Sequence, residues 1–459
     1  MSLEDLRSRI LLIADQTLKY AKDLSIPSVE VFVIEQSSTN LTDNNGKVDS
    51  RDGITQGLGI RVAEGKRIGF ASCTGFDKET VKLTLTRAHN IAKASPENPM
   101  FNGFVSESRT AKEGILDENI LNITSEDLIN NCNRMNDEVD LSDKRILSGT
   151  FGSSVTYTGF AVGTSEGCLS SSLTTTFGAS SYFVVMEEGD RKTAGNFVQS
   201  RKIEPVEGIG RKGLDKALEA LGSKAFGGSE VLPTVWEPRE TAPFLGFAFF
   251  NTLSGSSYVE KSNPWMEKLN EEVASKEFSI YDNGQLPHTQ ACQAIDTEGT
   301  PKQTTTVIEN GILKSFLFDK MFGEAAGFAS TGNALRTNPF GATPPYEASP
   351  NVSLNHITIK EGSKNLHEQI AEIDKGILIT GTPIGLFTSN PVTGDFSVTC
   401  NDTFLILNGE KAHPLKSVSI AGNYFKTLKN IQFIGNDTEI SGWPIDTPTI
   451  TFKGHTISD

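Results

Sequence analysis

The sequence predicts an α+β protein of two domains, because its helix-like and strand-like segments lack the regular βαβ alternation of a parallel sheet. Three observations indicate this class: a helical N-terminal segment followed by strand pairs, a central stretch rich in Ser, Thr, Gly, Val and Phe, and a second half dominated by strands and turns. With 459 residues and 37% hydrophobic content, the chain is long enough for two packed domains.

The first hundred residues predict a helix, two strand pairs and a second helix. Apolar residues at helical spacing between charges in 1–24 indicate an amphipathic helix rather than a signal peptide. Residues 28–35 alternate as a strand, and 39–51 form a turn and a second strand, so we expect a hairpin. Residues 56–71 predict another strand pair around a Glu-Gly turn, and 77–94 predict a helix.

The central stretch, 150–198, has the composition of a meandering antiparallel sheet, and a helix is expected at 214–221. The Gly-rich segment 222–230 disfavours both helix and strand, so it predicts a domain boundary. The expected domains are 1–228, with an antiparallel sheet and flanking helices, and the β-rich 229–459.

The second half contains a clear helical pattern at 241–253 and a shorter one within 314–327. Prolines at positions 339, 344, 345 and 350 predict an irregular loop, which is more often a surface connection than a lid.

Charge and cysteine usage exclude several classes of function. A formal net charge of −15 repels a phosphate backbone, so no nucleic-acid partner is expected. No apolar run approaches the roughly 20 residues of a membrane span. The five cysteines are scattered without a C-x-x-C pair, which indicates neither a disulfide framework nor a thiolate zinc site and favours a cytoplasmic location.

Two short motifs that suggest catalysis or nucleotide binding lack the required context. Gly163–Gly167 matches G-x-S-x-G, but a strand-like run follows it, so we expect Ser165 in a hairpin turn rather than at a nucleophile elbow. Gly208–Gly213 matches G-x-G-x-x-G, but polar residues and a proline precede it instead of a buried strand. We interpret this second motif as the entry to a helix.

Two polar segments are the candidate binding sites. Asp296 and Glu298, at i and i+2 of an expected strand, would face the same side and position a charge or a ligand, although a strand end is equally consistent. Farther along, Thr331, Gly332 and Asn333 predict a polar turn, and Arg336 offers donors for a carboxylate or for peptide carbonyls.

These two segments, together with 376–397 and 417–423, resemble the TldD/PmbA family of metallopeptidases, once called modulators of DNA gyrase. The resemblance runs nearly from end to end. The catalytic branch carries an H-E-x-x-x-H metal helix, and this sequence contains no such motif. By motif order, the corresponding helix here is 243–253, which has no His, Glu, Asp or Cys. Residues 347–354 are also similar to the PmbA (TldE) branch.

The resemblance implies roles for individual residues. Asp296 and Glu298 belong to a D-x-E-G segment found in both branches, and Thr331, Gly332, Asn333 and Arg336 lie toward the family's substrate region. All six are therefore candidates for peptide contact. Cys400, near the place of a metal-ligating cysteine in the catalytic branch, is expected to be a small buried hydrophobe instead.

The resemblance implies a non-metal subunit without a cofactor of its own, inactive without a TldD-like partner that holds zinc or iron. The pair would cleave unfolded proteins and peptides, with substrate bound as an added strand. Two alternatives stay open: a self-sufficient homodimeric peptidase with an unrecognised site, and a peptide-binding module without catalysis.

Overall fold

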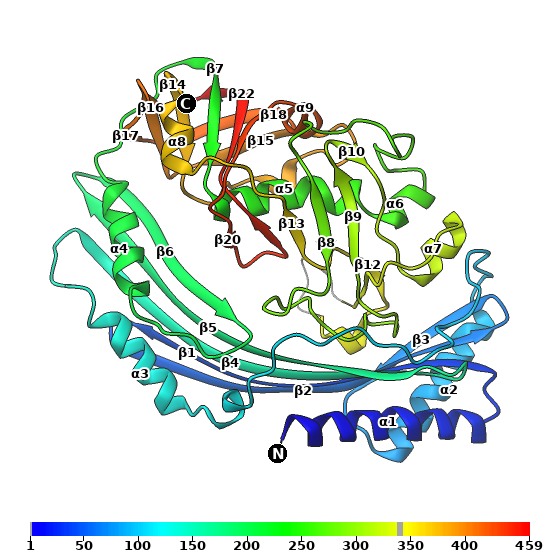
Figure 1. Ribbon diagram of the computed structural model, residues 1–459. Helices are drawn as coiled ribbons and strands as arrows, with labels where there is room; N and C mark the ends of the chain where they lie inside the picture. Colours follow the sequence, from blue (N-terminus) through cyan, green and yellow to red (C-terminus); the bar gives the residue numbers. More distant parts are fainter. Residues whose placement is uncertain (1, 337–342) are drawn as a thin grey trace.

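The computed structural model describes residues 2–336 and 343–459. The N-terminal half forms a long, curved antiparallel sheet (Figure 1). Its order is β3-β2-β1-β4-β5-β6, so the hairpin β1–β2 is extended by β3 on one side and by the β4–β5–β6 meander on the other. The strands are β1 (Ser28–Asn44), β2 (Lys47–Glu64), β3 (Arg67–Cys73), β4 (Ile146–Thr164), β5 (Leu169–Glu187) and β6 (Asp190–Ser200).

Helices α1 (Leu3–Asp23), α2 (Lys78–Ala94), α3 (Ser125–Asn136) and α4 (Ile209–Glu219) cover the convex face of this sheet (Figure 1). Helix α1 begins with a capping box, in which Ser2 and Asp5 satisfy each other's backbone donors. Helix α3 begins with the equivalent pair, Thr124 and Asp127, although the sequence reading did not include this helix.

Residues 29–34 of β1 are buried on both faces, because the C-terminal half lies over the concave side of the sheet (Figure 1). Val31 and Val33 pack toward the helices, whereas Phe32 and Ile34 pack with Tyr346 on the opposite face. The run of apolar residues in this strand therefore reflects two interfaces rather than one.

The C-terminal half combines two sheets. The larger has the order β15-β18-β22-β7-β14-β16-β17, with β19 also paired to β22, and the smaller has the order β10-β9-β8-β13-β21-β20. The strands are β7 (Ser229–Trp236), β8 (Ile280–Asn283), β9 (Thr304–Glu309), β10 (Ile312–Leu313), β13 (Ile357–Ile359), β14 (Lys375–Ile379), β15 (Asp395–Cys400), β16 (Thr403–Leu407), β17 (Glu410–Leu415), β18 (Val418–Asn423), β19 (Ile431–Ile434), β20 (Glu439–Ile440), β21 (Ile445–Thr447) and β22 (Ile450–Ser458). A separate short pair joins β11 (Ala334–Leu335) to β12 (Asn351–Val352).

Helix α5 (Pro238–Thr252) contributes to the core of this half. Phe244 stacks on Trp236 with ring centroids 4.2 Å apart, and buried His455 lies within the same aromatic group. The remaining helices are short: α6 (Gly255–Val259), α7 (Lys320–Ala326), α8 (Leu366–Ala371) and α9 (Tyr424–Lys429), with 3₁₀ turns η1 (Glu118–Asn122), η2 (Pro345–Glu347) and η3 (Leu386–Thr388).

The structure confirms the predicted α+β class. Ser165 lies in the tight turn between β4 and β5, and Gly208 is the N-cap of α4, so neither motif has the context that its chemistry needs. The division into domains 1–228 and 229–459 stays a prediction. Pro339, part of the predicted loop, lies outside the described residues.

Candidate functional site

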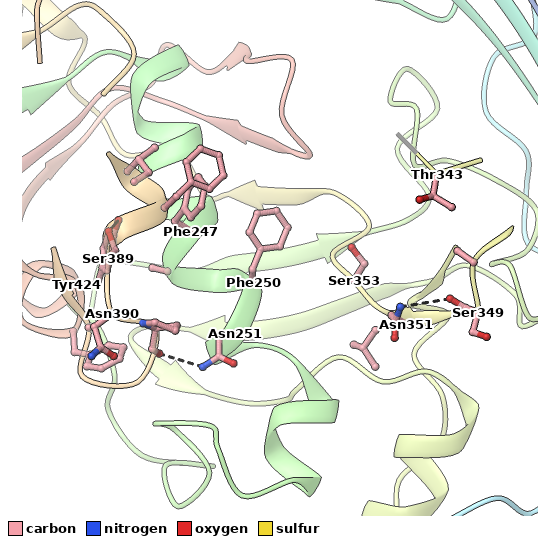
Figure 2. A pocket seen from close by; sticks show the side chains of 18 residues that line it. Phe247, Phe250, Asn251, Thr343, Ser349, Asn351, Ser353, Ser389, Asn390 and Tyr424 are labelled. Atoms are coloured by element: carbon pink, nitrogen blue, oxygen red, sulfur yellow. Dashed lines mark hydrogen bonds between the residues drawn. The ribbon is translucent and has the colours of Figure 1, made fainter. Parts of the chain in front are cut away.

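A cavity of about 790 Å³ lies against α5 (Figure 2). Phe247, Phe250 and Asn251 of α5 line one side of it. The other walls come from the 343–353 segment, from the loop 386–394 and from the start of α9. This cavity has the size and mixed lining typical of a ligand site.

The α5 wall is aromatic. Phe249 points into the core and is fully buried, whereas Phe247 and Phe250 are partly exposed and line the cavity. Phe247 packs edge to face against Phe387 from the opposite loop, with ring centroids 4.8 Å apart. Asn251 Nδ2 donates to the Pro391 carbonyl at 3.1 Å, which ties the same loop to the helix.

The rim is polar and uncharged. Ser349, Asn351 and Ser353 stand on one side, and Ser389 and Asn390 stand on the other (Figure 2). Tyr424 faces the cavity beside Ser389, and burial raises the pKa of its phenol to about 12. Such groups can hydrogen-bond to the main chain of a peptide without selecting a charge.

The lining suits binding better than metal chemistry. Among the lining residues that the structure describes, none is His, Cys, Asp or Glu. Residues 2–336 and 343–459 also contain no group of three such side chains able to hold a metal ion. Cys400 is fully buried, as predicted, and burial raises the pKa of its thiol, which makes it a poor ligand.

All six predicted peptide-contact residues are buried and lie outside the cavity lining: Asp296, Glu298, Thr331, Gly332, Asn333 and Arg336. The expected strand at Asp296 and Glu298 is wrong, because this segment is a turn. Asp296 Oδ1 accepts from the backbone N–H groups of Glu298 and Thr300, both at 2.9 Å, and Gly299 adopts a left-handed φ of 93°. The carboxylate of Asp296 is therefore held by the backbone of its own turn.

Glu298 takes part in a buried ionic network that joins the two halves. Arg61 of β2 bonds to Glu30 of β1 and donates to Glu298 Oε1 at 2.7 Å. Arg336 also donates to Glu30, and both of these side chains are fully inaccessible. A single carboxylate on the N-terminal sheet thus holds one arginine from each half.

Asp296 and Asp319 are buried close to Glu298, and both burial and its negative charge perturb their protonation. Burial, followed by the nearby charge of Glu298, raises the pKa of Asp296 to about 7 and that of Asp319 to about 8. Asp319 is also the N-cap of α7, where it accepts from Phe322 N–H.

Two of the buried candidates, Asn333 and Arg336, hydrogen-bond to the backbone of residues that line the cavity. Asn333 Nδ2 donates to the Ser353 carbonyl at 2.8 Å, and the Asn333 carbonyl accepts from Ser353 N–H at 2.9 Å. Arg336 Nη1 donates to the Ala348 carbonyl at 2.9 Å. Ala348 and Ser353 both line the cavity. These contacts position one wall of the site.

The sequence reading missed the aromatic lining, including Phe247, Phe250 and Tyr424. In sequence, the Phe-rich helix indicates a core element. The cavity becomes visible only when Phe250 is placed in space opposite the 343–353 segment and the 386–394 loop. The run of phenylalanines at 244–250, longer than one buried helix face needs, is the signal in the sequence that points to a second aromatic surface.

The fold and the site together define an α+β protein whose central helix borders a cleft without metal ligands. Family models match the chain as PmbA/TldA metallopeptidase domain 1 (29–92), central domain (118–221) and C-terminal domain (229–459). The chain belongs to the PmbA/TldD metallopeptidase family.

Its relatives include both named branches. An uncharacterised protein of Methanocaldococcus jannaschii is 28% identical over 94% of this chain and 96% of its own. A metalloprotease PmbA homologue of Haemophilus influenzae is 24% identical over 92% of this chain and 91% of its own, and TldD homologues match at similar identity.

TldE from Thermococcus kodakarensis has a similar fold, with a TM-score of 0.86, 22% identity and coverage of 97% of this chain and 100% of that structure. Within the described part of the chain, no helix is long and apolar enough to cross a membrane.

Proposed function

We propose that this chain is the non-metal, TldE-like subunit of a two-component metallopeptidase that degrades unfolded proteins and peptides. The observation that carries the proposal is the lining of the cavity against α5, where the helix presents Phe247, Phe250 and Asn251. Imidazole, thiolate and carboxylate are the side chains that hold zinc in proteins, and this wall offers none of them. The catalytic metal, zinc or iron, would belong to a TldD-like partner.

In this proposal the cavity holds part of an extended peptide. Aromatic rings on α5 would accept apolar side chains, while the amides and hydroxyls of Asn351, Ser353 and Asn390 would bond to the peptide main chain. Main-chain pairing depends little on sequence, which suits a peptidase for unfolded substrates. Of the six buried candidate residues, Asn333 and Arg336 would act by holding the Ala348–Ser353 wall in place.

The test is metal content and cleavage of an unstructured peptide, measured on the chain alone and on the chain co-expressed with a TldD-like partner. We expect negligible zinc and iron and no cleavage from the chain alone, and one metal per pair with cleavage from the complex. The control is a partner whose metal-binding histidines are replaced, which should still co-purify without activity.

Stoichiometric metal and cleavage by the chain alone would instead establish a self-sufficient homodimeric peptidase. Peptide binding without metal, partner or cleavage would establish a binding module. A cytoplasmic location, proposed from the cysteine pattern, is checked by fractionation of the source cells.

A further inference from the structure

A second cavity, of about 490 Å³, lies beside the first. The two share Phe250 and Ser353 in their linings. The second cavity is bounded by Gln199 of β6, by Asp446 of β21 and by His356, which directly precedes β13, so it lies where the two halves of the molecule meet. An extended ligand in the first cavity can therefore continue into the second.

Asp446 is the feature of this cavity that indicates a ligand. Its side chain is 8% exposed, and Oδ2 lies 3.0 Å from His356 Nε2 and 3.7 Å from His288 Nε2. Oδ1 is buried and has no hydrogen-bond partner among the described residues. Leaving a carboxylate oxygen buried without a donor is costly, so this atom is suited to accept from a bound molecule.

The charges around the cavity favour a cation as that molecule. Lys302 is the lysine in the lining, but its ammonium donates to Asn355. The nearby carboxylates of Asp296 and Asp282 already balance its positive charge. Among the described residues, the ion pairs of Asp446 are with the imidazoles of His288 and His356. The cavity therefore carries a carboxylate that forms no ion pair with a lysine or arginine of residues 2–336 and 343–459.

The remaining walls suit an ammonium group. Trp443 and Phe250 contribute aromatic surface, which attracts cations. Gln290 and Gln293 also line the cavity, and the Gln290 amide oxygen, which accepts from Thr176 Oγ1 at 2.9 Å, can accept a second hydrogen bond. These are the contacts that a primary ammonium needs once it leaves water: one carboxylate, further acceptors and an aromatic face.

We propose that this second cavity binds the ammonium group of a peptide, either its free amino terminus or a lysine side chain, with Asp446 Oδ1 as the anchoring acceptor. The inference rests on the proposed peptide-handling function and adds to it a preference for one charged group at a fixed place. A peptide would lie with its apolar part against Phe247 and its ammonium at Asp446.

The experiment is calorimetric titration of the isolated full chain with matched short peptides. One peptide has a free amino terminus and no lysine, the second is its N-acetylated form, and the third is N-acetylated with one lysine. We expect at least one ammonium-bearing peptide to bind about 10-fold to 100-fold more tightly than the acetylated, lysine-free one. Comparing the first and third peptides identifies the source of the group.

Asp446→Asn keeps the shape and removes the charge, so it should abolish this difference. Glu309→Gln removes an exposed carboxylate from β9 of the same sheet, outside the lining, and should leave the difference unchanged. Gln290→Glu adds a carboxylate to the cavity and should tighten binding of the ammonium-bearing peptide, which a variant that merely misfolds cannot do.

Equal affinity for all three peptides, unchanged in Asp446→Asn, would overturn the ammonium site while leaving peptide binding and the proposed function intact. Absence of binding by every peptide would overturn the ammonium site and the peptide role of the first cavity, whereas the two-component proposal would still be decided by cleavage in the co-expressed complex. An ammonium preference that depends on Asp446, found together with an inactive co-expressed complex, would support the site and contradict the two-component peptidase.

Discussion

Arg61 Nη2 lies 2.7 Å from Glu298 Oε1, which joins β2 of the N-terminal sheet to the turn at Asp296–Thr300 across 237 residues of sequence. The same guanidinium pairs with Glu30, and the side chains of the three residues are 11%, 4% and 0% exposed. Separating such a pair leaves an uncompensated charge in a dry environment.

Replacing this arginine should therefore destabilise the fold. Arg61→Met leaves Glu298 without its arginine, and we expect the free energy of unfolding in urea to fall by about 3–5 kcal/mol. Arg51→Met, on the same strand, is the control, because Arg51 pairs with Asp49 at the surface and its side chain is 81% exposed. That change should cost less than about 0.5 kcal/mol. Equal effects would show that the network contributes no more than a surface pair.

Asp319 should make stability fall as the pH rises toward 8. Its pKa is raised from 3.8 to about 8, so between these values the folded chain holds a proton that the unfolded chain has lost. The folded state binds more protons there, and its stability must decrease with increasing pH. Buried His455, whose pKa is lowered to about 3, acts in the opposite direction but only below its ordinary value of 6.5.

Asp319→Asn mimics the protonated carboxyl and preserves a good N-cap. Between pH 6.5 and 8.5 the wild type should lose about 1–2 kcal/mol more of its unfolding free energy than this variant does. Asp77→Asn changes the exposed N-cap of α2 and should leave the wild-type slope in place. Parallel curves of unfolding free energy against pH for wild type and Asp319→Asn would contradict a raised pKa at Asp319.

Gly57 is required for the approach of Tyr346 to the concave face of the sheet. A Cβ at Gly57 would lie 2.5 Å from the tyrosine ring, so Gly57→Ala should cost about 1–3 kcal/mol in chemical unfolding. The penalty should largely disappear in a Tyr346→Ala background, a coupling that a double-mutant cycle measures. Gly53→Ala is the control on the same strand, where a Cβ meets only the Ser38 hydroxyl at 3.2 Å.

Phe249 and Phe250 are neighbours in sequence with different expected roles. Phe249 is fully buried in the core, so Phe249→Ala should lower the free energy of unfolding by about 3–5 kcal/mol. Phe250 faces both cavities, so Phe250→Ala should weaken peptide binding about 10-fold or more with a smaller loss of stability. Thermal denaturation and calorimetric titration of both variants test this, and the reverse pattern would argue against a ligand at α5.

Local periodicity and turn chemistry predicted the β2–β3 hairpin and α2, but not α3, although α3 also begins with a capping box. The sequence did not predict the burial of Glu30 or the partners of Arg336, because those depend on contacts between residues about 300 positions apart. The same limit applies to the site. Resemblance drew attention to Asp296 and Arg336, whereas the cavities are defined by how Phe250 and Asp446 meet distant loops in space.

The ionic network has a mechanical consequence. Separating the C-terminal half from the curved sheet would take Glu298 away from Arg61 and Arg336 away from Glu30 at the same time. Each such separation is strongly unfavourable, so the network opposes a movement that opens the two halves. We therefore expect conformational change at the cavities to occur in the surrounding loops rather than between the two halves.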